Sequence, residues 1–301
     1  MVVKIDTRNV QKTGNMHYVY LPTLWCKKYN IDSDSKVSTK INSDGTLMIS
    51  PQIEEKELAE INLATDETTP EIITKLVIAC YVNPTKSFNI KLGKGTDVTK
   101  LMDKGNVVSV LEFVEFDENN ITYESTGTVG DPDILLKTMV KKIKHLLDVM
   151  VTDYNKELID KYEDEIDRSR LLIEKSVISV LTFSQQSKTS IIDLHYISSI
   201  SRDLERMVDS VIMVDKDENL FLKKILKIIE DISNLLENPE NLNYSSVIEL
   251  DKSIVAIKSP EIANIKAYGK RRIKRNLISI SEVLFDWALT KLIDKKVNQN
   301  E

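Results

Sequence analysis

Glycine and proline are scarce in this chain of 301 residues, which contains 8 of the first and 7 of the second. Collagen-like and low-complexity classes, which are rich in these residues, are therefore excluded. Seven of the eight glycines precede residue 131, and only Gly269 follows it. Because glycine marks turns and strand ends, this split predicts a mixed N-terminal part and a nearly all-helical C-terminal part.

Cysteine is rarer still: Cys26 and Cys80 stand alone, without a C-x-x-C pair. This excludes a disulfide scaffold and argues against a thiolate metal site. Uncharged apolar runs of about 18 residues, the length that spans a membrane, are absent, and so is a signal-peptide core. We therefore expect a cytoplasmic protein with no transmembrane segment.

Charge is unevenly distributed along the chain, although 42% hydrophobic and 29% charged residues are ordinary values for a globular protein. Residues 1–52 carry a net charge of +3, whereas the whole chain carries −6. A basic head on an acidic body permits contact with nucleic acid at one end only.

The first 52 residues show short apolar runs separated by turn signals. They predict two strands, a short helix over 23–29 capped by Thr23, and a hairpin that turns at Asp44-Gly45. A unit of this size buries too little surface to be stable alone. We therefore expect it to oligomerise or to pack on the rest of the chain.

Three features of this head resemble the swapped-hairpin domain of the AbrB, SpoVT and MazE group. They are R-x-V-Q-K-T-G at residues 8–14, a strand that ends in Leu21-Pro22, and a hairpin that ends in Ser50-Pro51. The resemblance implies an interlocked homodimer whose N-terminal strands present cations to duplex DNA.

The cations that the resemblance assigns to DNA phosphates are Lys4, Arg8 and Lys12. Their even spacing lets them share one face of an extended ribbon. The alternative is a dimerisation module without affinity for DNA.

Residues 53–130 have a mixed pattern that predicts a small α+β segment. We expect a helix to start at 54–58, an amphipathic helix over 70–81, and strands over 87–92, 107–114 and 120–124. Gly93-Lys94-Gly95 is interpreted as a turn, because it lacks the G-x-x-x-x-G-K-[ST] spacing of a phosphate loop.

From residue 131 onward, apolar residues recur with the helical period. Their short connections favour antiparallel packing in two sets of three helices. The six predicted helices cover 133–154, 158–183, 187–214, 220–236, 244–257 and 260 to about 296.

Two of these helices carry acidic pairs with the spacing E-x-x-x-D: Glu163 with Asp167, and Glu205 with Asp209. Residues four apart share one helical face, so adjacent antiparallel helices can direct all four carboxylates at one point. Such carboxylates repel one another unless a cation lies between them, which suits a metal with oxygen ligands. The alternative is a pair of solvated acidic faces.

Glu163-x-x-x-Asp167 and the run L-E-R-M-V-D at 204–209 resemble the paired signatures of the PhoU family of phosphate-uptake regulators. The resemblance implies a bundle of two three-helix halves whose carboxylates bind iron, zinc, manganese or magnesium. The second half departs from the family pattern, with Val247 in the position equivalent to Glu163. It keeps a weaker candidate set of Asp251, Glu282 and Asp286.

The head and the helices together resemble archaeal-type PhoU-like regulators that carry an AbrB-like domain. We therefore expect a multidomain α+β protein divided into 1–52, 53–130 and 131–301. The resemblance implies a non-enzymatic regulator of phosphate uptake or phosphate homeostasis that docks on a phosphate transporter or a phosphate-signalling protein. Two alternatives stay open: a DNA-binding transcriptional regulator whose bundle senses an effector, and a metal-dependent hydrolase, which lacks a candidate nucleophile.

Three further features lie in the helical part. His145 and His195 are expected to be packed or capping groups. The segment 270–275 holds five cations in six residues, typical of a solvated face or a countercharge for the acidic body, with a partner or DNA surface as the alternative. Gly269 is a candidate bend in the last helix.

Overall fold

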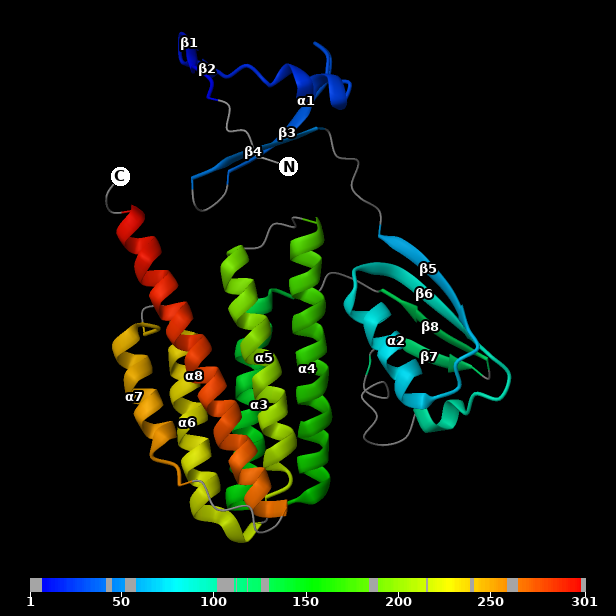
Figure 1. The fold of residues 1–301 in the computed structure, drawn as a ribbon, viewed down its shortest axis with the longest axis vertical. Coiled ribbons are helices and arrows are strands. Elements are labelled where there is room, and N and C mark those ends of the chain that lie inside the picture. The colour runs from blue at the N-terminus through cyan, green and yellow to red at the C-terminus, as the bar shows by residue number, and fades with distance from the viewer. Residues whose placement is uncertain are drawn as a thin grey trace. The chain divides into compact units, whose positions relative to one another are not determined.

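The computed structural model divides the chain into two compact units, Met1–Glu57 and Leu58–Glu301 (Figure 1). The molecule is α+β, with strands in its N-terminal part and helices in its C-terminal part, as the glycine distribution predicts. The predicted segments 53–130 and 131–301 share the second unit. The structure describes residues 7–41, 45–51, 58–101, 111, 113–117, 119–125, 130–183, 189–214, 216–238, 241–258 and 265–298.

The first unit has the predicted order of two strands, a short helix and a hairpin. β1 (Gln11–Thr13) pairs antiparallel with β2 (Met16–Tyr18), and α1 (Thr23–Lys28) precedes an antiparallel pair of β3 (Val37–Ile41) and β4 (Leu47–Pro51). Gly14 turns the first pair with a φ of 63°. The expected Thr23 cap is wrong: Pro22 holds the N-cap position without a side-chain bond, so the Thr23 hydroxyl lies one residue too late.

None of the residues described between 7 and 51 is buried. Large apolar side chains are left in contact with solvent, among them Met16, Tyr20 and Leu24. Apolar area removed from water is the main favourable term in folding, and this unit lacks it. A single copy of the described segment therefore has no core of its own.

The second unit begins with a four-stranded sheet in the order β5-β6-β8-β7. β5 (Ala59–Thr65) and β6 (Thr85–Leu92) are parallel and are connected through α2 (Pro70–Val82), whereas β7 (Val114–Asp117) and β8 (Asn120–Glu124) pair antiparallel. The predicted helix at 70–81 and the strands at 87–92 and 120–124 are confirmed. Most of the predicted strand at 107–114 lies outside the described residues.

Strand β5 was not predicted from the sequence. The acidic start of this segment favoured a helix at 54–58, of which the structure describes only Leu58. Ile61 and Leu63, two residues apart, pack against the core of the α+β layer. Their alternation with exposed residues is the strand signal.

Six helices follow, in the places that the periodicity predicts. α4 packs against α3 and α5, α7 packs against α6 and α8, and the pairs α3–α6 and α5–α8 join them. Their apolar faces form one continuous core. The helices are α3 (Pro132–Thr152), α4 (Lys156–Phe183), α5 (Ile191–Val211), α6 (Asn219–Glu237), α7 (Tyr244–Val255) and α8 (Ile265–Asn298).

Gly269 lies where α8 approaches α5 closely. A Cβ atom added to it would lie 3.3 Å from the carbonyl oxygen of Ser210 and 3.5 Å from the Cβ of Met213. The absence of a side chain therefore lets the two helix backbones come together.

α4 also joins the α+β layer to the bundle. Leu171 of α4 is fully buried in the core of the sheet layer, and Nζ of the buried Lys175 donates to the hydroxyl of Tyr123 in β8. The same ammonium lies 4.3 Å from the ring centroid of Tyr81 in α2. These contacts explain why the middle segment and the helices form one unit.

Among the helices of the described ranges, none combines the length and apolar character needed to cross a membrane.

Candidate metal centre

Three of the four carboxylates predicted as metal ligands lie together between α4 and α5. One oxygen of Asp167, one of Glu205 and one of Asp209 are all within 4.8 Å of one another. The two helices are neighbours and antiparallel (Figure 1), so the two E-x-x-x-D motifs meet as the spacing predicts. Within the part of the chain that the structure describes, this is the one such group of acidic, histidine or cysteine side chains.

Apolar neighbours in the sequence fix these carboxylates at the edge of the core. Ile166 on α4 and Leu204 and Val208 on α5 are buried, and each directly precedes one of the three acidic residues. Because consecutive helical residues lie about 100° apart, burying the first places the second at the margin of the helix contact. The carboxylates are accordingly half-buried rather than fully solvated.

Burial is the main cause of the raised pKa values in the cluster. It raises the pKa of Asp167 to about 7, assisted by the negative charges of Glu205, Asp209 and Glu163. Burial also raises the pKa of Glu205 and of Asp209, and the charge of Asp209 adds to the rise at Glu205. These acids resist ionisation in one another's presence, so a cation between them stabilises their charged forms.

Nearby arginines compensate only part of this charge. Arg170 directs Nη1 to Glu174 at 2.8 Å, whereas its Nε is 3.9 Å from Glu205 and buried without a hydrogen-bond partner among the described residues. Glu174 also accepts from Arg202 at 2.7 Å. Arg272 of α8 opposes the rise of the pKa of Asp209.

The residues present therefore fit a divalent cation. The donor set is made of carboxylate oxygens, which hard divalent ions prefer, and its charge is incompletely neutralised by the protein. The charge of Arg170 opposes the rise of the pKa of all three acids, but its hydrogen bond goes to Glu174 and its Nε has no hydrogen-bond partner among the described residues. Sequence reasoning missed Arg170, Glu174 and Arg202; the spacing of Arg170, three residues after Asp167, was the available signal for the first. Arg272 belongs to the basic run that was interpreted as a solvated face or a countercharge for the acidic body.

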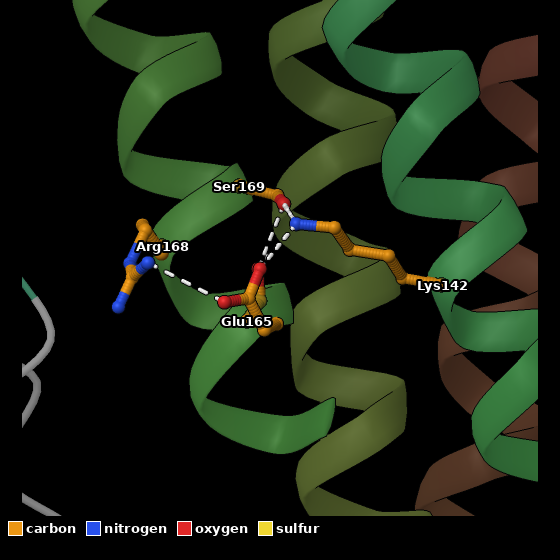
Figure 2. Close-up of polar contacts among 4 residues, drawn as sticks. All are labelled: Lys142, Glu165, Arg168 and Ser169. Atoms are coloured by element: carbon orange, nitrogen blue, oxygen red, sulfur yellow. Dashed lines mark hydrogen bonds and ion pairs between the residues drawn. The ribbon is translucent and has the colours of Figure 1, made fainter. Parts of the chain in front are cut away.

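A fourth carboxylate of the same acidic run, Glu165, points elsewhere. Figure 2 shows Lys142 of α3 reaching Glu165 and Ser169, while Arg168 contacts Glu165 from the other side. The Lys142 Nζ lies 2.6 Å from Glu165 Oε2, and this hydrogen bond lowers the pKa of Glu165. Glu165 and Asp167 are only two residues apart on α4, yet the first carboxylate is neutralised and the second is available to a cation.

Glu163, the remaining predicted ligand of the first set, lies outside the group of three. Burial raises its pKa, and the charge of Asp209 contributes to that rise, so its carboxylate faces the same region. It stands next to the cluster rather than within it.

The weaker second set does not assemble in the described structure. Asp251 accepts a hydrogen bond from Ser281 at 2.7 Å, while Glu282 and Asp286 are exposed on α8. Val247, which occupies the position equivalent to Glu163, is fully buried. In the second half of the bundle a buried apolar side chain thus replaces one carboxylate, and Ser281 hydrogen-bonds the carboxylate of Asp251.

The remaining candidate residues are dispersed. Arg8 and Lys12 are exposed in the first unit, and Lys4 lies outside the described residues. His145 and His195, expected to be packed or capping groups, are both exposed, and the ring of His195 contacts that of Tyr196 with the centroids 5.5 Å apart.

The basic run at the start of α8 divides among several partners. Lys270 pairs with Glu218 at 2.5 Å, and Nζ of Lys274 donates to the carbonyl oxygens of Val255 and Ile257 at the end of α7. Arg272 faces the carboxylate cluster, whereas Arg271 and Arg275 are exposed.

Fold and site together define an α+β protein with a helical bundle that holds a carboxylate cluster. The chain matches no family model, no curated protein and no solved structure.

Proposed function

We propose that the protein is a non-enzymatic regulator of phosphate uptake or phosphate homeostasis, acting through a metal-carrying helical bundle of the PhoU type. The observation that carries the proposal is the convergence of Asp167, Glu205 and Asp209 from two E-x-x-x-D helices. These are the positions at which the sequence resembles the paired signatures of that family.

The helix contacts support a bundle of two three-helix halves. α3, α4 and α5 pack among themselves, as α6, α7 and α8 do in the order α6–α7–α8. The first helices of the two sets, α3 and α6, contact each other, and so do the last helices, α5 and α8. This pairing is compatible with an approximate two-fold repeat.

In this proposal the cluster is a structural and regulatory centre. Asp167 would hold the ion from α4, and Glu205 and Asp209 would hold it from α5, with Glu163 next to them. A bound divalent cation supplies the positive charge that the arginines leave incomplete. Arg170, held by Glu174, keeps its Nε 3.9 Å from Glu205 and so borders the cluster on that side. The bundle would then dock on a phosphate transporter or a phosphate-signalling protein.

The first unit would serve as a swapped-hairpin dimerisation domain. Its described residues include no buried side chain, so a second copy interlocked with it would provide the missing core.

Elemental analysis of the purified full chain tests the metal claim. We expect bound manganese, iron, zinc or magnesium in the wild type and its loss in Glu205→Ala with Asp209→Ala. Glu282→Ala with Asp286→Ala is the matched control, because it removes the same two residue types at the same spacing from an exposed face. Wild-type protein that is metal-free and whose melting temperature does not respond to added manganese contradicts the proposal.

Purification from native cells tests the partner claim. The wild type is expected to retain a phosphate transporter or phosphate-signalling protein that the variant lacking Glu205 and Asp209 carboxylates loses. Retention of the same proteins by both would show that the cluster does not govern docking.

A second candidate function is a DNA-binding transcriptional regulator whose bundle senses an effector. It is favoured by the net charge of +3 over residues 1–52 and by the exposure of Arg8 and Lys12. Binding of duplex DNA should weaken steeply with salt, and Lys12→Ala should flatten that dependence. No binding at low salt would remove this candidate.

A further inference from the structure

The outer face of α8 carries an ordered row of side chains that the carboxylate cluster does not use. Tyr268, Arg275, Glu282 and Leu289 follow at intervals of seven residues, and all four are exposed. Seven residues make nearly two helical turns, so these side chains lie in one row along the helix. Exposed Arg271 and Asp286 extend the basic and the acidic part of the row.

The charged part of this face has no partner within the described structure, and the ring of Tyr268 at its end contacts the guanidinium of Arg272 of the same helix, 5.8 Å from the ring centroid. α8 packs inward against α5 and α7, burying Leu277 and Ile280. Arg271, Arg275, Glu282 and Asp286 make no side-chain hydrogen bond or ion pair with the residues that are described. Lys270 and Lys274 of the same basic run each bind a neighbouring group, Glu218 and the carbonyl oxygen of Ile257. The two exposed arginines differ from these lysines because they have no such partner among the described residues.

We propose that this face binds the same face of a second copy of the chain, with the two α8 helices antiparallel. A two-fold axis between Ile278 and Ser279 places Arg271 opposite Asp286 and Arg275 opposite Glu282 of the other copy. The same axis places Tyr268 opposite Leu289, whose side chains are 46% and 45% exposed. Symmetry repeats every pair, giving four ion pairs with an apolar contact at each end.

The order of the charges selects this partner. Parallel pairing would set arginine against arginine and carboxylate against carboxylate, which is unfavourable. A nucleic acid attracted by Arg271 and Arg275 would meet Glu282 and Asp286 within the next three turns of the same face. Only an antiparallel copy satisfies the basic and the acidic parts together.

Cysteine cross-linking in the full chain tests the register. Tyr268→Cys with Leu289→Cys, introduced together and exposed to a mild oxidant, should give a disulfide between position 268 of one chain and position 289 of another. Peptide mass spectrometry identifies the linked positions, and the parent chain with native Cys26 and Cys80 gives the background. A dominant link between two copies of position 268, or no link above background, overturns the proposal.

Charge reversal in this cross-linking chain tests the cause. Arg271→Glu with Arg275→Glu, and separately Glu282→Arg with Asp286→Arg, should each reduce the link at least about tenfold, because four surface pairs become repulsive together. An equal mixture of the two variants, unfolded and refolded together so that mixed dimers can form, should restore it, because an acidic face then meets a basic one.

Lys223→Glu with Lys224→Glu, at two exposed positions of α6, is the matched control for net charge and should leave the link unchanged. A link that survives either reversal, or a mixture that stays unlinked, contradicts the proposal. The reversals leave residues 1–57 intact, so a dimer held by the first unit does not alter the outcome.

Discussion

Glu165 and Asp167 show how two carboxylates within one turn of a helix acquire opposite properties. Lys142 and Arg168 neutralise the first, and its pKa is lowered; burial among other acids raises the pKa of the second. In the sequence both lie in the acidic segment 163–167. What separates them is the neighbouring helix, since α3 offers a lysine to one face and α5 offers two carboxylates to the other.

The raised pKa of Asp167 predicts the pH dependence of the metal-free protein. Between its ordinary value of 3.8 and about 7, the folded state keeps a proton that the unfolded state has released. This contribution to stability is therefore fully present below pH 3.8 and is lost as the pH rises through 7.

Asp167→Asn should remove this loss of stability at high pH, because an asparagine side chain does not ionise. In the presence of a chelator at pH 8, we expect the free energy of unfolding to rise by on the order of 1 kcal/mol, with little change at pH 4. Urea denaturation at both pH values measures it, and Asp148→Asn at an exposed position of α3 is the control. A variant less stable than wild type at pH 8 would contradict the electrostatic account.

At the scale of single residues, the candidate ligands were predictable because helical spacing alone places Glu205 and Asp209 on one face. The sequence did not predict that the second candidate set, Asp251, Glu282 and Asp286, fails to assemble. That failure depends on which way α7 and α8 turn in the bundle, and only packing decides that. The approach of Arg170 to Glu205 was equally hidden, because Glu205 comes from another helix, whereas its pairing with Glu174 has the i,i+4 spacing of one helix.

At the scale of elements, Gly269 sets the separation of α5 and α8. We expect Gly269→Val to lower the free energy of unfolding by about 1–3 kcal/mol, because a branched side chain would press on Ser210 and Met213. Chemical denaturation measures the loss.

Lys296→Val, at an exposed position of the same helix, controls for the helix propensity of valine and should cost about 0.5 kcal/mol. Equal losses for the two variants would show that the close approach does not need a glycine.

Lys175 and Tyr123 connect α4 with the sheet. Lys175→Met keeps most of the side-chain volume but leaves the Tyr123 hydroxyl unpaired, and Tyr123→Phe leaves the ammonium without its acceptor. Each should cost about 1–2 kcal/mol of stability.

The double variant should cost less than the sum of the two by about 0.5–1.5 kcal/mol, because one interaction is removed only once. Equilibrium unfolding of the four proteins of this cycle measures the difference. Strict additivity would show that the two side chains do not stabilise each other.

Element prediction worked best where the apolar period is long. The six helices from Pro132 onward lie within a few residues of their predicted positions. β5 was not predicted, because its alternation of apolar and polar residues covers only a few positions and follows an acidic stretch that favours a helix. Its strand state is stabilised by parallel pairing with β6, which lies more than twenty residues away in the sequence.

At the scale of the whole molecule, the two units differ in how they are stabilised. The second has continuous cores, whereas no described residue of the first is buried. At low protein concentration we therefore expect the full chain to be a dimer and a chain of residues 58–301 to be a monomer.

Sedimentation equilibrium of both chains measures this difference, with concentration raised stepwise to detect weaker pairing through α8. A full chain that is monomeric at every concentration would contradict dimerisation through either unit. The structure divides the chain after Glu57, whereas the change in charge along the sequence suggests a boundary after residue 52. The union of the middle segment with the bundle was not predicted, because it depends on contacts made by α4.

α4 contributes side chains to two hydrophobic cores, and this has a thermodynamic consequence. Leu171 belongs to the core of the sheet layer, while Ile166 and Ile173 of the same helix belong to the core of the bundle. Lys175 lies eight residues after Asp167, about 12 Å along the same rigid axis. Melting α4 would dismantle both cores at once, so the sheet layer and the bundle constitute one cooperative unit. Calorimetry should then record a single endotherm for residues 58–301, and a ligand that binds at Asp167 should protect the amide hydrogens of β8 from exchange as well as those of α5.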